Sequence, residues 1–251
     1  MVMDMVDYRL YGGDTQFVEI EIDPGKAVVG ESANMLYMED GIAASTVLGD
    51  ASSRAVGRGW LGKLLSVGKR LITGDSLFTT VYTNQSSGRR KLAFSAPQSG
   101  QIRALDLSQH GGTLMCQRSA FVCAARGLSM NVALQRKLGS SGVGAERFIV
   151  QKLVGEGMVF IQSSGCLLER ELTADEALHV DIGCLVAYIP GTGFDLRFAG
   201  GKAALLVGKG PSFATLRGPG RVWLQSLPFT RLSSRLFAAA PASYGRVGRR
   251  A

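Results

Sequence analysis

The residues that come nearest to a chemical motif lie at 57–64, in the run GRGWLGKL. This run contains GxGxxG and also fits GxxxxGK, two patterns in which backbone N–H groups hold phosphates. The second pattern needs Ser or Thr after Lys63 to ligate magnesium, and Leu64 has no hydroxyl. Both patterns also need a buried strand before the glycines, and the preceding residues 50–56, DASSRAV, do not form one. We therefore interpret the run as a flexible approach to a helix rather than a phosphate site.

Nucleophilic catalysis and histidine-based metal binding find little support in the sequence. The chain has two histidines, His110 in a Gln-His-Gly-Gly turn and His179 at an outward position of an alternating strand. No GxSxG motif occurs, and a triad would need one of these two histidines. The carboxylates of Glu19, Glu21 and Asp23 alternate along one strand, which is typical of a solvated face. We predict no catalytic residues, no metal, no cofactor and no enzymatic activity.

The four cysteines lie in apolar, strand-like runs. They are Cys116, Cys123, Cys166 and Cys184. No CxxC pair occurs, and no Cys/His spacing matches a zinc site. Free cysteine behaves as a small hydrophobic residue in protein interiors. We therefore expect these cysteines to be buried, reduced thiols.

The net charge of +8 is concentrated in two segments. Residues 51–73 and residues 231–251 each carry five Lys or Arg side chains and no acid, so the remainder has a net charge of −2. A protein that binds nucleic acid more often spreads its basic side chains along a groove or a sheet face. The distribution therefore argues against a nucleic-acid partner. We predict that residues 231–251 form a basic, partly disordered tail.

Most of the chain alternates between apolar and polar residues with the period of a β-strand. Turn signals interrupt this pattern every ~6–12 residues, as in an all-β sandwich or barrel. The hydrophobic fraction of 46% and the charged fraction of 19% are those of a globular protein. The sequence therefore predicts an all-β fold.

Three related segments account for most of the molecule. The clearest, residues 18–42, is a strand, a Pro-Gly turn, a second strand, a small-residue step and an apolar strand. Counterparts begin at residues 106–108 and 171–173. Repeats of this kind build one continuous core by stacking. We predict a single domain, residues 1–230, made of three repeats at about 7–100, 101–165 and 166–230.

The first repeat carries an insertion that coincides with the basic segment 51–73. Its apolar residues recur with i, i+3, i+4, i+7 spacing and basic residues fall opposite, which predicts a short amphipathic helix over 60–72. This helix either attaches to an anionic membrane or a partner groove, or it covers a sheet end or a subunit interface. The residues predicted to make the membrane or partner contact are Trp60, Leu61, Lys63, Leu64, Leu65, Lys69 and Arg70.

Four strings of residues carry a resemblance to a known family. They are QFVEIEIDPGKAVVGESANMLYMEDGI, GDSLF, LVGEGMVFIQSSG and RGPGRVWLQSLP. These strings resemble the altered inheritance of mitochondria protein 24 family, which in bacteria is a domain-of-unknown-function family and has a fold similar to the tryptophan RNA-binding attenuator protein. The resemblance covers roughly residues 7–230. It implies a double-stranded β-helix or repeated β-sandwich that forms homo-oligomers.

The resemblance implies little about chemistry. Mitochondrial members of the family are associated with the inner membrane and its cristae-organising complex, and the family offers no catalytic residues to place on this chain. A shared fold does not by itself imply tryptophan or RNA binding.

We expect a non-enzymatic scaffold that self-associates, because repeated sheets leave edges that closed oligomers cover. Its expected partners are further copies of itself and a protein or an anionic membrane surface reached through the inserted helix. The alternative is a module that binds a small molecule or sugar in the lumen of the β-helix. The N-terminus lacks the basic and apolar regions of a signal peptide, which favours a cytoplasmic protein with at most a peripheral membrane contact.

Overall fold

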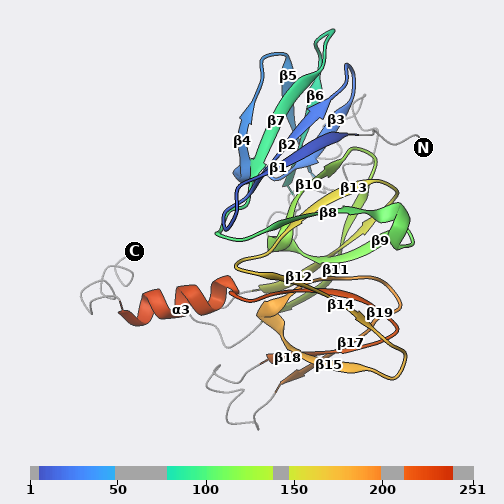
Figure 1. The fold of residues 1–251 in the computed structure, drawn as a ribbon, viewed down its shortest axis with the longest axis vertical. Helices are drawn as coiled ribbons and strands as arrows, with labels where there is room; N and C mark the ends of the chain where they lie inside the picture. Colours follow the sequence, from blue (N-terminus) through green and yellow to red (C-terminus); the bar gives the residue numbers. More distant parts are fainter. Residues whose placement is uncertain (1–5, 49–77, 138–146, 199–211, 240–251) are drawn as a thin grey trace, which may run out of the picture.

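The chain folds into four antiparallel β-sheets stacked along its long axis, with one helix projecting from the side (Figure 1). This structure is a computed structural model that describes residues 6–48, 78–137, 147–198 and 212–239. Every pairing between its named strands is antiparallel. The predicted all-β class is confirmed.

The two outer sheets are the smaller ones. The first sheet has the order β1-β2-β7-β4 and the fourth has the order β15-β18-β17. The bounds in the first sheet are β1 Asp7–Tyr11, β2 Phe17–Ile22, β7 Arg90–Ser95 and β4 Met35–Met38. Those in the fourth sheet are β15 Ala177–Asp181, β18 Ser212–Arg217 and β17 Gly193–Phe198.

The two inner sheets have six strands each. The second sheet has the order β5-β6-β3-β10-β13-β8, and the third has the order β11-β12-β9-β16-β19-β14. The second is built from β5 Ile42–Leu48, β6 Phe78–Asn84, β3 Ala27–Gly30, β10 Phe121–Ala125, β13 Met158–Gln162 and β8 Ile102–Asp106. The third is built from β11 Ser129–Lys137, β12 Arg147–Val154, β9 Thr113–Gln117, β16 Leu185–Tyr188, β19 Gly220–Gln225 and β14 Leu167–Leu172.

The same strand order occurs in three successive groups of six strands, which we call units one (β2–β7), two (β8–β13) and three (β14–β19). In unit one, β2-β7-β4 lie in one sheet and β5-β6-β3 in the next. Units two and three repeat this arrangement with β8-β13-β10 and β11-β12-β9, and with β14-β19-β16 and β17-β18-β15. The predicted repeat bounds and the double-stranded β-helix stay predictions.

Neighbouring units are joined edge to edge. Strand β3 of unit one pairs with β10 of unit two, and β9 of unit two pairs with β16 of unit three. Each inner sheet therefore belongs half to one unit and half to the next. Because neither inner sheet is confined to one unit, the second unit cannot separate from its neighbours without breaking backbone hydrogen bonds.

Glutamine side chains reinforce these joints at the start of each unit. The Ile102 N–H donates to Gln16 Oε1 at 2.8 Å, and the Leu167 N–H donates to Gln101 Oε1 at 3.0 Å. Gly100 forms isolated parallel bridges with residues 15 and 165 at the same place. A Cβ on Gly100 would lie 1.8 Å from the Ser163 carbonyl oxygen, so only glycine fits this crossing.

Three hydrophobic cores fill the spaces between the four sheets. The alternation in β2 buries Val18, Ile20 and Ile22 between the first and second sheets, as the sequence predicted. Phe160 on β13 lies in the same core, and Trp223 on β19 lies in the core between the second and third sheets. Both aromatic side chains are fully buried. Phe160 belongs to unit two and packs against unit one, and Trp223 belongs to unit three and packs against unit two.

Four short 3-10 helices and one α-helix complete the described elements. They are η1 Ser32–Asn34, η2 Leu107–His110, η3 Arg118–Ala120, η4 Ile182–Cys184 and α3 Phe229–Ala239. Three of the 3-10 helices, η1, η3 and η4, stand at equivalent positions, just before β4, β10 and β16. The helix predicted over 60–72 lies outside the described residues.

We predict that Phe160→Ala lowers the free energy of unfolding by about 3–5 kcal/mol, because it empties a core site shared by two units. Urea unfolding followed by circular dichroism measures the change. Leu168→Ala on the exposed side of β14 is the control and should cost less than about 1 kcal/mol. Equal losses in the two variants would contradict a core that is continuous between units.

Candidate functional site

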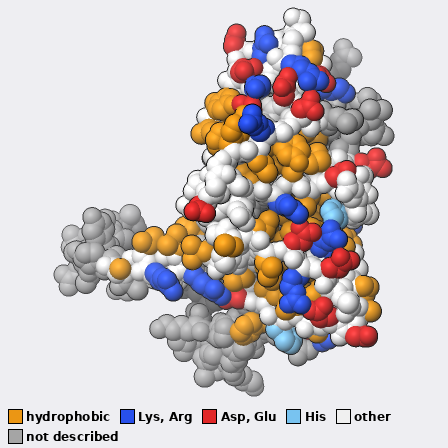
Figure 2. Space-filling view, in the orientation of Figure 1, with side chains coloured by type: hydrophobic (Ala, Val, Ile, Leu, Met, Phe, Trp, Pro, Cys, Tyr) orange, Lys and Arg blue, Asp and Glu red, His pale blue; other side chains and the backbone are white. Residues whose placement is uncertain are grey.

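Helix α3 carries an exposed apolar stripe. Phe229, Leu232 and Leu236 follow one another at spacings of three and four residues, and Leu236 is 61% exposed. Such spacing places them on one side of an α-helix. Arg231 and Arg235 are four residues apart and lie on a different side. Figure 2 shows hydrophobic side chains along one side of the projecting helix and basic side chains along the other.

The first turn of α3 attaches the helix to the sheet stack. Pro228 is buried, and its carbonyl oxygen accepts the N–H of Arg231 at 2.9 Å and that of Leu232 at 3.4 Å. Arg231 also forms an ion pair with Asp181, at the end of β15, with a nitrogen-to-oxygen distance of 3.0 Å. The hydrogen bond to Asp181 raises the pKa of Arg231. The rest of the helix extends away from the sheets (Figure 1).

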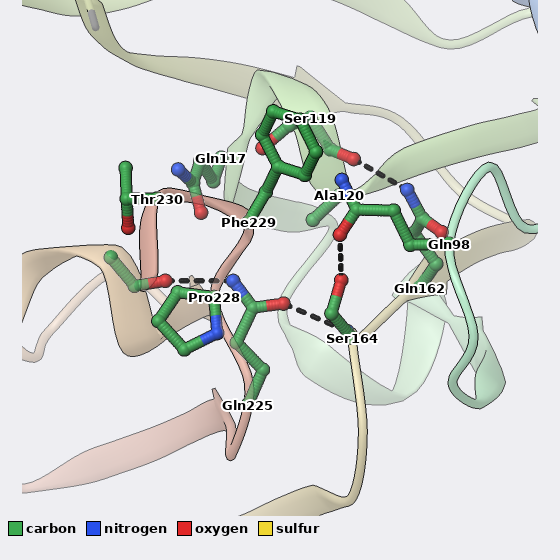
Figure 3. Close-up of a pocket in the computed structure, with 11 residues that line it drawn as sticks. Gln98, Gln117, Ser119, Ala120, Gln162, Ser164, Gln225, Pro228, Phe229 and Thr230 are labelled. Carbon is green, nitrogen blue, oxygen red and sulfur yellow. Dashed lines mark hydrogen bonds between the residues drawn. The ribbon is translucent and has the colours of Figure 1, made fainter. Parts of the chain in front are cut away.

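A polar pocket lies beside this first turn (Figure 3). It encloses about 70 Å³, and the start of α3 forms part of its wall through Pro228, Phe229 and Thr230. Four glutamines from four separate segments of the chain line it, namely Gln98, Gln117, Gln162 and Gln225. Two serines, Ser119 and Ser164, complete the polar lining.

Two of the glutamines occupy equivalent positions in their units, at the ends of β13 and β19. Gln225 uses both ends of its amide, because Nε2 donates to the Gly183 carbonyl at 2.7 Å and Oε1 accepts the Ser164 N–H at 2.9 Å. Gln162 Nε2 donates in the same way to the Ser119 carbonyl at 2.7 Å, but its Oε1 has no hydrogen-bond partner. Counted from the end of the preceding strand, the position equivalent to Ser164 is Pro97, which has no N–H to give.

The pocket therefore contains buried acceptors without donors. Gln162 is only 4% exposed, and Oε1 of Gln117, on the same pocket wall, also has no partner. A buried polar atom without a partner is costly, so such atoms usually face water or a ligand. No sequence pattern marks this pocket, because its glutamines are far apart in the chain and follow no motif.

The outer face of the first sheet carries a hydrogen-bonded cluster centred on Glu19. Its carboxylate accepts hydrogen bonds from the hydroxyls of Tyr37 and Tyr11 and pairs with Lys91 Nζ at 3.0 Å. The Tyr37 hydrogen bond and Lys91 lower the pKa of Glu19, and the same hydrogen bond raises the pKa of Tyr37 to about 12. The neighbouring Glu21 and Asp23 both pair with Arg89. The predicted acidic face is thus present and is neutralised by basic partners.

Strand β4, at the edge of the first sheet, exposes large apolar side chains. Leu36 is 51% exposed, and Tyr37 and Met38 are also exposed. Figure 2 shows hydrophobic side chains gathered over this strand. Contiguous exposed apolar side chains on a sheet edge commonly mark an interaction site.

The histidines take structural positions. His110 is half-buried at the end of η2, with its ring edge-on to Trp223 at 5.6 Å, and burial followed by the charge of Arg221 lowers its pKa. His179 is exposed on β15, with Nδ1 3.0 Å from Thr215 Oγ1. Within the four described ranges, no three His, Cys, Asp or Glu side chains gather as a metal site would require.

The prediction that the cysteines are buried is confirmed for two of the four. Cys116 and Cys123 are buried, and burial raises the pKa of both thiols, while Cys184 is half-buried. Cys166 is exposed. It precedes β14, which is an edge strand of the third sheet, so the apolar run that follows does not cover it.

The predicted contact residues Trp60, Leu61, Lys63, Leu64, Leu65, Lys69 and Arg70 lie outside the described residues. The described basic amphipathic helix is instead α3, in the segment predicted to be a basic tail; residues 240–251 of that segment lie outside the description. The sequence did carry a signal for α3, because Phe229, Leu232 and Leu236 alternate with arginines at helical spacing. No helix of the described residues is both long enough and apolar enough to cross a membrane.

Stacked antiparallel sheets with a peripheral basic helix define an all-β protein. The sequence model of the mitochondrial biogenesis AIM24 family matches residues 8–227, so the chain belongs to that family. An uncharacterised protein of Streptococcus pyogenes serotype M6, M6_Spy0233, is 26% identical over 235 residues, which is 90% of this chain and 87% of that protein. The crystal structure of protein SPYM3_0169 from Streptococcus pyogenes aligns with a TM-score of 0.70 at 21% identity. That alignment covers 94% of this chain and 100% of the other and shows a common fold.

Gln225→Ala should destabilise the protein more than Gln162→Ala. The first change leaves the Ser164 N–H and the Gly183 carbonyl without partners, at a cost of about 1–3 kcal/mol, while the second removes one hydrogen bond and an already unpaired oxygen. Urea unfolding of the two variants measures the difference. A larger loss for Gln162→Ala would show that Gln162 Oε1 has a partner in solution.

The Glu19 cluster should make stability depend on pH. The lowered pKa of Glu19 means that its contribution is present above the unfolded-state value near 4.5 and is lost as pH falls through the folded-state value. We expect Glu19→Gln to lower the urea midpoint at pH 7, and the difference from the parent protein to shrink as the pH falls below 4.5. Glu156→Gln, in an exposed turn, serves as the control and should have the urea midpoint of the parent protein throughout this pH range.

Proposed function

We propose that this protein is a non-enzymatic scaffold that self-associates and attaches to an anionic membrane surface through helix α3. The observation that carries the proposal is the exposed apolar stripe of a basic helix that extends from the body (Figures 1 and 2). A helix with apolar and basic sides lies in a membrane interface with its apolar side among the acyl chains.

Charge favours an anionic lipid surface as the occupant. Residues 231–251 contain five arginines and no acid. Each basic side chain near an anionic leaflet contributes about 1 kcal/mol, whereas the same arginines beside an apolar protein groove would lose hydration. Arg235 is exposed and lies one turn beyond the arginine that pairs with Asp181.

The apolar stripe of α3 contributes a binding free energy similar to that of the arginines. Burying one Leu or Phe side chain fully stabilises by about 1.5–3 kcal/mol, and Phe229, Leu232 and Leu236 are each between one third and two thirds exposed. Three such side chains therefore contribute roughly 3 kcal/mol, which with two or three arginines gives only weak attachment for one copy. Self-association makes the attachment strong, because linked copies bind with a high effective concentration.

The pocket favours a second candidate function, the binding of a small neutral ligand. Its two buried acceptors, Gln117 Oε1 and Gln162 Oε1, require hydrogen-bond donors, and no carboxylate lines the pocket to balance a cation. The ring of Phe229 offers an apolar surface beside them. A small polyol supplies hydroxyl donors, and one edge of a sugar ring supplies hydroxyl donors together with an apolar face. Either would bind at the base of α3 rather than in a lumen.

The membrane proposal is tested by flotation with liposomes of mixed neutral and anionic lipid. Leu232→Asp and Leu236→Asp should each reduce the bound fraction at least tenfold, because a charge replaces a side chain that enters the acyl region. Arg235→Glu should reduce the bound fraction by a comparable factor. Added salt should likewise reduce the bound fraction of the parent protein, because it screens the attraction between arginine and anionic lipid. Val132→Asp, an exposed apolar site on β11, is the matched control and should float like the parent. Equal flotation of all four variants would exclude α3 as the anchor.

The ligand candidate is tested by thermal unfolding with millimolar monosaccharides and linear polyols. Binding to the folded state raises the midpoint in proportion to RT ln(1 + [L]/Kd). Gln162→Leu should abolish the rise, while Gln85→Leu in the exposed turn after β6 should leave it unchanged. The absence of any rise with the parent protein would discard this candidate without affecting the membrane proposal.

A further inference from the structure

The units leave one unused joining strand at each end of the stack. Strands β10 and β16 each pair with a strand of the preceding unit, β3 and β9 respectively. The equivalent of β10 and β16 in unit one is β4, and the equivalent of β3 and β9 in unit three is β15. Among the described strands, β4 and β15 are both terminal in their sheets. They are thus complementary ends, at opposite ends of the molecule (Figure 1).

The two internal joints share one register. Cys123 lies opposite Gly30 and Ala124 opposite Val29 in the first joint. In the second joint, Ala187 lies opposite Cys116 and Tyr188 opposite Met115. The paired residues occupy the same positions in both joints when β10 and β16 are counted from the 3-10 helix that precedes them, and β3 and β9 from the one that follows them. The same register between copies places Tyr37 opposite Val180 and Met38 opposite His179.

An irregularity in the three joining strands also recurs. The register to the next strand inward shifts between Met35 and Tyr37 in β4, between Phe121 and Cys123 in β10, and between Leu185 and Ala187 in β16. A β-bulge at a fixed position re-aims the side chains around it and is a designed feature. Strand β4 therefore has the geometry of a joining strand, although no unit precedes it among the described residues.

Burial separates the used strands from the unused one. The residues at the shift are Val122 in β10 and Val186 in β16, both 0% exposed because the preceding unit covers them. The equivalent Leu36 is 51% exposed. Tyr37 and Met38 are exposed as well, whereas Cys123, Ala124 and Ala187 at their positions are buried. The apolar character of a joint is present on β4 without its cover.

The residues on the outer face of the first sheet, beside β4, determine how strong a contact at β4 can be. Phe160 and Trp223, opposite Cys123 and Ala187, fill the core of the preceding unit, but the residue opposite Tyr37 is Ala93. Glu19 and Lys91 occupy the same outer face. A contact at β4 therefore lacks the aromatic anchor of the internal joints, which makes it a reversible contact of strand edges.

We propose that β4 of one copy pairs with β15 of the next copy, head to tail, and so continues the sheet stack from molecule to molecule. This inference rests on the self-association in the proposed function and names its partner, a second copy of this chain. Because the two edges differ, the contact is heterologous and generates a ring or a filament rather than a two-fold dimer.

The test uses single-cysteine variants that are mixed. Met38→Cys and His179→Cys are prepared separately in a Cys166→Ser, Cys184→Ser background, which removes the two native thiols that are not buried. Paired strands bring opposed Cα atoms within the range that a disulfide spans. Under mild oxidation the mixture should give a disulfide-linked dimer at least tenfold faster than either variant alone. The variant with both cysteines should give a ladder of multimers, because its two thiols lie too far apart to join within one chain.

The control is Val132→Cys on β11, another edge strand of the stack, mixed with His179→Cys. It should crosslink no faster than the single variants. Dimers from Met38→Cys alone at the rate of the mixture would show a head-to-head contact and overturn the inference. A multimer by light scattering with no crosslink in any mixture would also overturn it while leaving self-association intact. A monomer at all concentrations would overturn both, and liposome flotation judges the membrane contact separately.

Discussion

The structure depends on backbone hydrogen bonds that join one unit to the next. A three-stranded half-sheet has an exposed edge and a thin core, and it would be marginal alone. Pairing β3 with β10 and β9 with β16 converts six half-sheets into two continuous six-stranded sheets and two outer ones. The buried aromatic side chains Phe160 and Trp223 then enter the cores of the preceding units. Packing between sheets and pairing within them therefore reinforce each other, as in other stacked repeat proteins.

Departures from the repeat are concentrated where function is proposed. Gln162 and Gln225 stand at equivalent places, yet Pro97 removes the donor that Gln162 would need. Ala93 replaces an aromatic anchor on the first sheet, and Glu19, Tyr37 and Lys91 cover that face with polar groups. Terminal repeats must differ from inner ones, because one of their faces meets water. The apolar edge of β4 is the part of the first unit that does not follow this rule.

Helix α3 stands where a fourth unit would begin. In units one and two the chain that leaves β7 or β13 continues into the next β-strand, whereas after β19 it turns at Pro228 into a basic helix. The ion pair between Arg231 and Asp181 fixes the first turn beside the end of β15. The surfaces proposed for lipid and for a second copy therefore lie near each other at this end of the stack. A scaffold that binds a surface through many weak helices gains from such proximity, because each added copy brings another helix.

The sequence by itself determined the all-β class, the apolar inner face of β2 and the family, because strand period and turn residues are local properties of the chain. It also determined that positive charge gathers in two segments. Tertiary structure alone decided which of three similar strands is buried. Leu36, Val122 and Val186 are all apolar, and their exposure differs because, among the described residues, only the strands of Val122 and Val186 pair with a preceding unit. It likewise decided that Cys166 is exposed and that four distant glutamines share a pocket. Burial and convergence depend on neighbours brought by long-range pairing, and a local pattern carries no information about those neighbours.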